Sequence, residues 1–199
     1  MTENTRAYSL SLIFDGWAGY NTSLVHAIEP LTAEQLTWRP APGLRSVGEA
    51  ARHIAFGRLG WFMRMDAPGS RELVARIDAW QVDSDGNRHV DEAAFAIVEQ
   101  PEELVAWLQA TWGMIDKTLS EWTAADLART YRHTFAGVAY DVSRQWTIWR
   151  IMAHDIHHGG QLSTMLGIQG IEAFELIGLG GHIVAPPTAG PDGASAEPG

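Results

Sequence analysis

Apolar residues recur every three or four positions along most of this chain, and this spacing predicts helices rather than strands. Four stretches carry such a stripe over enough residues to form long amphipathic helices. We predict these helices over residues 5–29, 47–65, 101–121 and 143–166. Because such helices bury their stripes against one another, the pattern predicts an all-α fold of the four-helix bundle type.

Local signals mark two helix starts and describe the last helix. Ser46 and Glu49 form a Ser-x-x-Glu capping box at the start of the second helix. Pro101 occupies the favoured first position of the third. Trp146 and Trp149 widen the apolar face of the last helix, which predicts that this helix is buried on several sides.

Weaker patterns predict the connections between the helices. Residues 66–93 lack a clear period, and a connection this long in a compact domain is often functional, so we expect a lid or a pocket wall there. Residues 127–140 alternate in character, which predicts a short hairpin or strap before the last helix. The apolar, glycine-rich segment 171–184 is expected to pack back across the helices. We therefore predict one helical domain over residues 1–184 and a disordered tail over 185–199.

The composition excludes several classes of function. The 199 residues carry 14 basic against 24 acidic side chains, and the net charge of −10 repels phosphate backbones, so we expect no nucleic-acid partner. No apolar run approaches the roughly 20 residues of a membrane span, and residues 1–6 lack a signal-peptide layout. The absence of cysteine excludes disulfides and a thiol nucleophile, and it suits a cytoplasmic location.

Three of the eight histidines fall within five residues of the last predicted helix. His154 and His158 are four positions apart, so both imidazoles can reach one ion, whereas His157 points to a neighbouring face. Apolar neighbours predict that the pair faces the core, where an unsatisfied polar group costs about 1–3 kcal/mol. A metal with a third ligand would satisfy both rings. Spacing alone leaves open a helix that simply carries histidines.

His53, in the second predicted helix, is the natural third ligand. Gly57 and Gly60 follow it, and because each costs the helix about 1 kcal/mol relative to alanine, we expect a close neighbour there. A core histidine with an ordinary hydrogen-bond partner is the alternative. Three neutral imidazoles would leave a coordination position for water or substrate, as in a catalytic site. Zinc fits this ligand set best, while nickel, iron and copper remain open.

Two motifs carry a family resemblance. The sequence SVGEAARHI at residues 46–54 and the sequence HDIHHGGQL at residues 154–162 resemble the two motifs of the DinB/YfiT-like superfamily, the second of which usually reads His-x-x-x-His-Arg-Gly-Gln. The similarity covers roughly residues 5–180. Gly159 replaces the arginine that is common after the last histidine, which predicts altered contacts with a substrate or an anion.

The resemblance implies a four-helix bundle, a divalent metal held by His53, His154 and His158, and frequently a homodimer. Characterised relatives include transferases and isomerases that use mycothiol or bacillithiol. The resemblance therefore favours a low-molecular-weight thiol as cosubstrate and a small electrophile as substrate. We also expect Gln161, in the second motif, and Asn21, which interrupts the apolar stripe of the first helix, near the metal ligands or in the pocket. A core amide bonded to backbone is an equal alternative for Asn21.

Two other functions remain open. In metal-assisted hydrolysis, Glu49 or Asp155 would act as the base, because the pattern His154-Asp155-x-x-His158 imitates the His-Glu-x-x-His motif of zinc peptidases. Asp155 lies off the metal-facing side, however, and capping explains Glu49. The other alternative is a metal-binding stress protein without catalysis. His182 is a distant candidate for a fourth ligand.

Overall fold

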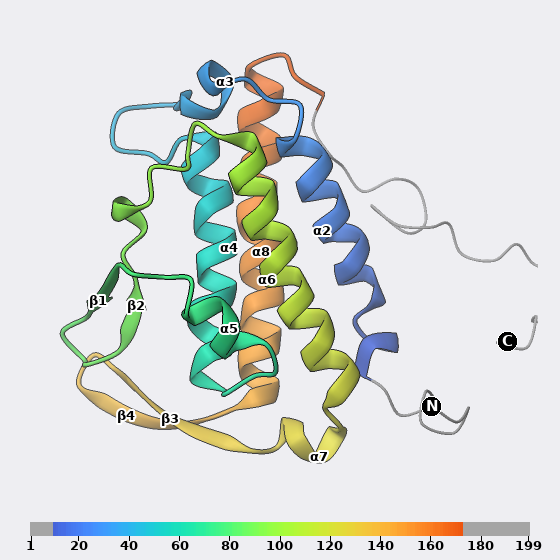
Figure 1. Ribbon diagram of the computed structural model, residues 1–199, viewed down its shortest axis with the longest axis vertical. Helices are drawn as coiled ribbons and strands as arrows, with labels where there is room; N and C mark the ends of the chain where they lie inside the picture. The colour runs from blue at the N-terminus through green and yellow to red at the C-terminus, as the bar shows by residue number, and fades with distance from the viewer. Residues whose placement is uncertain (1–9, 173–199) are drawn as a thin grey trace, which may run out of the picture.

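The computed structural model describes residues 10–172, and helices dominate this part of the chain (Figure 1). The long helices lie side by side and are α2 (Asp15–Ile28), α4 (Val47–Arg64), α6 (Pro101–Glu121) and α8 (Arg144–Ile168). Helix α4 contacts both α6 and α8, and α2 contacts α6. The prediction of a mostly helical fold is confirmed.

Short elements connect the long helices. The helical ones are η1 (Leu10–Leu12), α3 (Ala33–Thr37), α5 (Ser70–Val74), η2 (Glu92–Ala94) and α7 (Ala124–Leu127). The strands are β1 (Trp80–Val82), β2 (Arg88–Val90), β3 (Thr130–Phe135) and β4 (Val138–Ser143). They form two antiparallel hairpins, β1–β2 and β3–β4. The second hairpin is the one expected before the last helix, whereas the first lies in the segment 66–93, for which no strand was predicted.

The tips of the two hairpins are joined to each other. The Asp85 carboxylate accepts hydrogen bonds from the backbone N–H groups of Ala136 (2.7 Å) and Gly137 (2.8 Å). The Asn87 side chain donates to the carbonyl oxygen of Thr134 at 2.9 Å. Figure 1 shows the tip of β3–β4 reaching the tip of β1–β2. The segment 66–93 thereby holds the β3–β4 hairpin in place.

The core lies between the long helices, as the apolar stripes predict. Each long helix contributes fully buried side chains, for example Leu24, Ile54, Leu108 and Ile151. Burying a leucine or isoleucine side chain stabilises a fold by about 1.5–3 kcal/mol, so such positions dominate its stability. Within residues 10–172, no helix combines the length and the apolar character needed to cross a bilayer.

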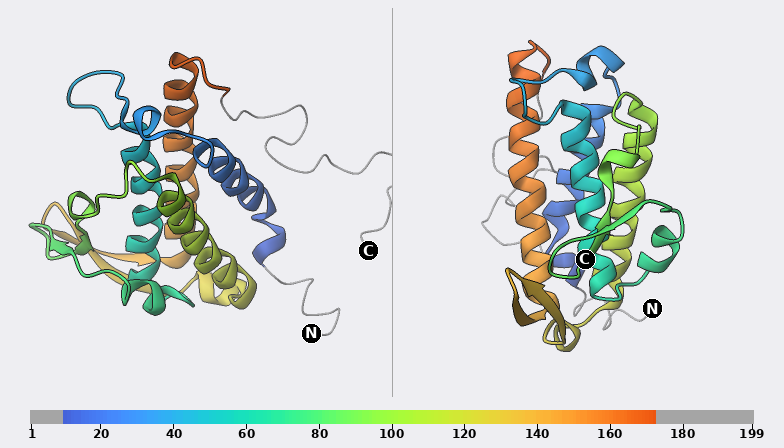
Figure 2. Two further views of the ribbon diagram at one scale, coloured as in Figure 1. Left: turned by 45° about the horizontal axis from the view of Figure 1, so that its top comes forward. Right: turned by 90° about the vertical axis from the view of Figure 1, so that its left-hand side faces the viewer.

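Two details of the helices differ from the prediction. The first long helix begins at Asp15, and Ile13, which lies within the predicted range 5–29, is 74% exposed. The side chain of Trp149 is 60% exposed and that of Trp146 is 44% exposed, so burial of the last helix on several sides was wrong. The reason is the position of α8 at the edge of the group of helices, where one side faces solvent (Figure 2).

Several predicted features lie outside the described residues. These are His182, nearly all of the segment 171–184 and the tail 185–199. The same holds for residues 5–9 of the first predicted helix.

Candidate metal centre

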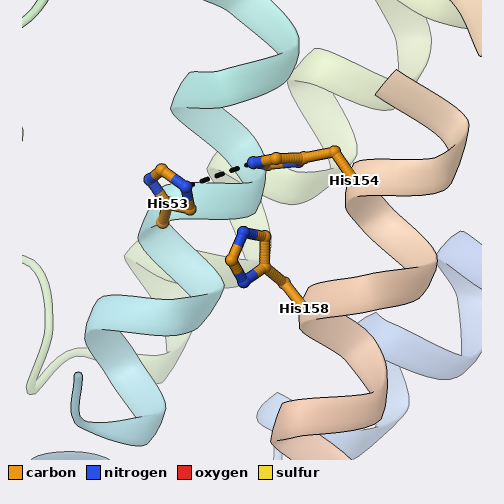
Figure 3. A group of neighbouring side chains, drawn as sticks. All are labelled: His53, His154 and His158. Atoms are coloured by element: carbon orange, nitrogen blue, oxygen red, sulfur yellow. Dashed lines mark hydrogen bonds between the residues drawn. The ribbon is translucent and has the colours of Figure 1, made fainter. Parts of the chain in front are cut away.

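Helices α4 and α8 bring three imidazoles to one point (Figure 3). His53 extends from α4, and His154 and His158 extend from successive turns of α8. One ring nitrogen of each residue lies within 4.8 Å of the other two. The closest pair is Nε2 of His53 and Nε2 of His154, which are 3.2 Å apart. The three histidines singled out in the sequence are thus close enough to bind a metal.

One nitrogen–nitrogen distance fits a zinc-sized ion. Two nitrogens bound at about 2.0–2.1 Å in tetrahedral geometry lie roughly 3.3 Å apart, close to the 3.2 Å between His53 and His154. That distance also suits an N–H···N hydrogen bond between neutral rings. The third ring, of His158, adds a nitrogen donor at the same point. A cluster of three imidazole nitrogens without a cysteine is a ligand set suited to zinc, nickel, iron or copper.

A glycine on α4 makes room for one of these rings. A Cβ atom added at Gly57 would lie 2.8 Å from Cε1 of His154, a distance that side chains do not tolerate. The close neighbour expected at this glycine is therefore the imidazole itself. A Cβ atom at Gly60 would meet no atom within 4 Å, so close approach does not explain that glycine.

Two of the rings have acceptors for their outer nitrogens. Nδ1 of His53 lies 2.7 Å from Oε1 of Glu92, and Nδ1 of His158 lies 2.8 Å from Oε1 of Gln161. Because these oxygens accept, Nδ1 of each ring carries the proton and Nε2 keeps its lone pair for a ligand bond. Gln161, which was expected near the metal ligands or in the pocket, makes this contact with the His158 ring.

Electrostatics keep these groups in the states that ligation requires. Burial, the largest effect, lowers the pKa of His158 to about 4, so this ring is neutral near pH 7. Burial, the largest single effect, raises the pKa of Glu92, but its hydrogen bond to His53 and nearby positive charges, among them Arg52, together outweigh burial and lower it. Glu92 is therefore an ionised acceptor for the His53 ring.

His154 lacks such a partner on its outer nitrogen. Among residues 10–172 its buried Nδ1 atom has no hydrogen-bond partner, and Oδ1 of Asp155 is 3.6 Å away. His157 stays outside the cluster, as predicted: its ring accepts a hydrogen bond from Nε2 of Gln161 at 3.2 Å.

Asp155 joins a buried network through Oδ2, while its Oδ1 atom lies 3.6 Å from Nδ1 of His154. Its Oδ2 atom accepts hydrogen bonds from Nε of Arg58 and from Nε1 of Trp17, both at 2.8 Å. The Arg58 guanidinium also donates to Oδ1 of Asn21 at 2.7 Å and to the carbonyl oxygen of Leu108 at 3.2 Å. The side chains of Arg58 and Asp155 are both 0% exposed. Asn21 thus bonds to a buried arginine, which is neither of the two environments expected for it.

Glu49 is also engaged elsewhere. Both of its oxygens accept from the Arg39 guanidinium, at 2.6 and 2.7 Å, and Oε2 accepts from the backbone N–H of Ser46 at 2.9 Å. The hydrogen bonds from Arg39, the largest effect, hold the pKa of Glu49 below its usual value. These contacts account for Glu49 through capping and ion pairing, and they make it a weak base.

Gly159, where the family motif usually has arginine, faces α2. A Cβ atom at this position would collide with the hydroxyl group of Tyr20. That hydroxyl donates to the carbonyl oxygen of Ile156 at 3.3 Å, and burial, the largest effect, raises the pKa of Tyr20 to about 12. Tyr20 therefore occupies the space beside α8 into which a longer side chain would extend.

Two charged residues of the site were not predicted from the sequence: Glu92, which contacts His53, and Arg58, which contacts Asp155. Glu92 lies in the segment 66–93, which has no clear period, and is 39 positions from His53, so no spacing pointed to it. Arg58 sits on the buried face of α4, where an apolar residue is the usual occupant. A charged residue at that point of the apolar stripe was the available signal.

The fold and the site together define a class of protein: a mostly helical protein in which three histidines converge between two helices. A family model described as the DinB superfamily matches residues 21–162, and the chain belongs to this superfamily. The crystal structure of a DinB-like protein from Bacillus cereus ATCC 10987 is similar, with a TM-score of 0.57 and 18% sequence identity. The match covers 80% of this chain and 92% of that one, and at this identity it supports the fold alone. A search of curated proteins found no match.

Proposed function

We propose that this protein is a metal-dependent enzyme that uses a low-molecular-weight thiol, of the mycothiol or bacillithiol type, in an S-transfer or isomerisation reaction. The observation that carries the proposal is the convergence of His53, His154 and His158, with ligand atoms within 4.8 Å of one another. Three neutral nitrogen ligands leave a position for an external ligand, as in catalytic rather than structural sites. A bound divalent ion would lower the pKa of a thiol there, as it does for water.

The residues of the chain would orient this site. Glu92 accepts the Nδ1 proton of His53, and Gln161 accepts that of His158, so both rings turn Nε2 inward. Since the chain has no cysteine, the reacting thiol comes from outside. Zinc is the first candidate for the metal, and nickel or iron are alternatives. A homodimer and a cytoplasmic location remain parts of this proposal.

Hydrolysis is less well supported by the contacts. It would require a free carboxylate as base, but Asp155 is bonded to Arg58 and Trp17, and Glu49 to Arg39. A metal-binding protein without catalysis would keep the same three ligands. Activity assays therefore decide between these two alternatives and thiol transfer.

The ligand assignment is tested by alanine variants. His53→Ala, His154→Ala and His158→Ala should each lose stoichiometric metal, because two remaining imidazoles bind an ion much more weakly. His157→Ala is the matched control and should keep it, since His157 lies outside the cluster. Elemental analysis of protein purified without added metal measures both. Equal metal loss in the control would contradict the assignment.

The chemistry is tested on metal-loaded protein. Mycothiol or bacillithiol is mixed with 1-chloro-2,4-dinitrobenzene, and formation of the thioether is followed by absorbance. A panel of esters and amides is assayed in parallel. Thiol conjugation that is lost in His154→Ala would support the proposal. Turnover of esters or amides would favour hydrolysis, and turnover of neither with metal bound would favour the protein without catalysis.

A further inference from the structure

A hollow lies near the histidine cluster, between the β3–β4 hairpin and helices α4 and α8. We call it the hairpin pocket; the lining used below is Trp61, Trp146, Arg150, His133, Phe135 and Tyr140. Its volume is about 590 Å³. Pockets for small organic ligands span roughly 300–1,000 Å³, so this hollow is large enough for a whole small molecule.

The hairpin pocket begins one helical turn from the metal ligands. On α4, Trp61 follows Gly57, which contacts the His154 ring, by four residues. On α8, Arg150 precedes His154 by four residues. Residues four apart share a face and lie about 6 Å apart along a helix. The pocket and the histidine cluster therefore occupy one continuous face between α4 and α8.

Aromatic rings form the walls of the pocket. The rings of Trp61 and Trp146 have centroids 5.9 Å apart, and His133 packs on Trp61 at 4.9 Å. Phe135 and Tyr140, from the hairpin, are large apolar side chains that stay exposed at its rim. Flat rings around an open hollow favour a ligand with a flat apolar body.

One cation in the pocket has no anionic partner among residues 10–172. The Arg150 guanidinium stacks over Trp61 at 4.7 Å and over Trp146 at 5.4 Å, and neither contact uses its N–H groups. A stacked guanidinium keeps its N–H edge free to bind a carboxylate through two hydrogen bonds. The nearby Arg64 also stacks over Trp61 but donates to the carbonyl oxygen of Arg88.

The acidic residue at the rim of the pocket has a basic partner of its own. Asp141 at the rim pairs with Arg132 at 4.0 Å. Burial and the charge of Arg64, with burial the larger effect, lower the pKa of His133, which favours its neutral form. The Nδ1 atom of His133 is buried without a hydrogen-bond partner. The pocket thus offers a cation and an unused polar atom within aromatic walls.

We propose that the hairpin pocket binds a small organic acid with a flat apolar body, whose carboxylate is held by Arg150 and whose body lies among the rings. The proposal that the pocket binds such an acid depends only on the residues of the hairpin pocket. That this acid is the substrate placed next to the thiol rests on the proposed function, because it requires the metal site one turn away.

Binding is tested with 2-naphthoate and its neutral analogue 2-naphthamide by calorimetric titration. Wild-type protein should bind the naphthoate about tenfold or more tightly than the amide, because only the acid can pair with the guanidinium. Arg150→Gln should weaken naphthoate binding by about tenfold or more and leave amide binding unchanged. Arg71→Gln is the matched control: it removes the same charge at an exposed arginine that pairs with Asp66, and it should bind like wild type.

Circular dichroism melting checks that Arg150→Gln is folded, which its exposed position favours. Equal affinity for acid and amide, or unchanged naphthoate affinity in Arg150→Gln, would overturn the proposal. The His154→Ala variant, which is expected to lack the metal, distinguishes the failure of the pocket proposal from the failure of the proposed thiol transfer. If it still binds naphthoate, the pocket stands even where thiol transfer is absent. If it loses naphthoate together with the metal, the carboxylate binds the ion and the pocket proposal is wrong.

Discussion

Two side chains other than the three histidines set the direction of the metal-facing nitrogens. Glu92 and Gln161 accept from the outer nitrogens of His53 and His158 at 2.7 and 2.8 Å. An acceptor at this position fixes which ring nitrogen is protonated and raises the basicity of the other. Because Glu92 is ionised and Gln161 is neutral, we expect the carboxylate to have the larger influence on metal affinity.

Replacing Glu92 by glutamine tests this influence. Glu92→Gln keeps an acceptor oxygen but removes the charge, so metal affinity should fall by about 10–100-fold. Titration against a chromogenic chelator measures the affinity. Glu72→Gln, an exposed acid on α5, is the control and should match wild type. Unchanged affinity in Glu92→Gln would show that this contact does not tune the metal.

The sequence predicts the ligands better than it predicts their partners. His154 and His158 follow from helical spacing, because residues four apart share a face on any helix. Their meeting with His53 was inferred from the glycines that follow His53 and was supported by the family resemblance, because the packing of α4 on α8 does not follow from helical spacing. Glu92 could not be predicted, because its contact depends on the path of a segment without a period.

The packing of α8 against α4 and α2 depends on two glycines. Gly57 admits the His154 ring, and Gly159 admits the Tyr20 hydroxyl. At both positions an added Cβ atom would have to displace the neighbouring ring. The long helices were predicted from apolar stripes, whereas the hairpin β1–β2 was not predicted: its strands are three residues long and lie in the segment 66–93, which has no clear period.

Two glycines of α4 provide a matched test of this close approach. Gly60→Ala should stabilise the protein by about 1 kcal/mol, because alanine favours helix and its Cβ meets no atom within 4 Å. Gly57→Ala gains the same propensity but displaces the His154 ring, so metal affinity should fall by about tenfold or more. Urea unfolding and chelator titration measure the two effects. Equal metal affinity in both variants would contradict the role of Gly57.

At the scale of the whole molecule, one buried network joins all four long helices. Arg58 on α4 donates hydrogen bonds to Asn21 on α2 and to the backbone of Leu108 on α6. It also donates to Asp155 on α8, and Asp155 accepts a further hydrogen bond from Trp17 on α2. The arginine and the aspartate are 97 positions apart in the chain, so no local pattern relates them. The network crosses the core directly behind the metal-binding turn of α8, because Asp155 follows His154.

This arrangement predicts that Asp155 is needed for folding rather than for proton transfer. Asp155→Ala leaves the Arg58 charge buried without its partner, so the free energy of unfolding should fall by about 3–5 kcal/mol in urea titrations. Asp66→Ala breaks the exposed pair with Arg71 and should cost at most about 1 kcal/mol. The folded fraction of Asp155→Ala should still bind metal, since the three imidazoles remain. Loss of turnover at unchanged stability would instead assign Asp155 to the reaction, and the buried ion pair could not then be its main role.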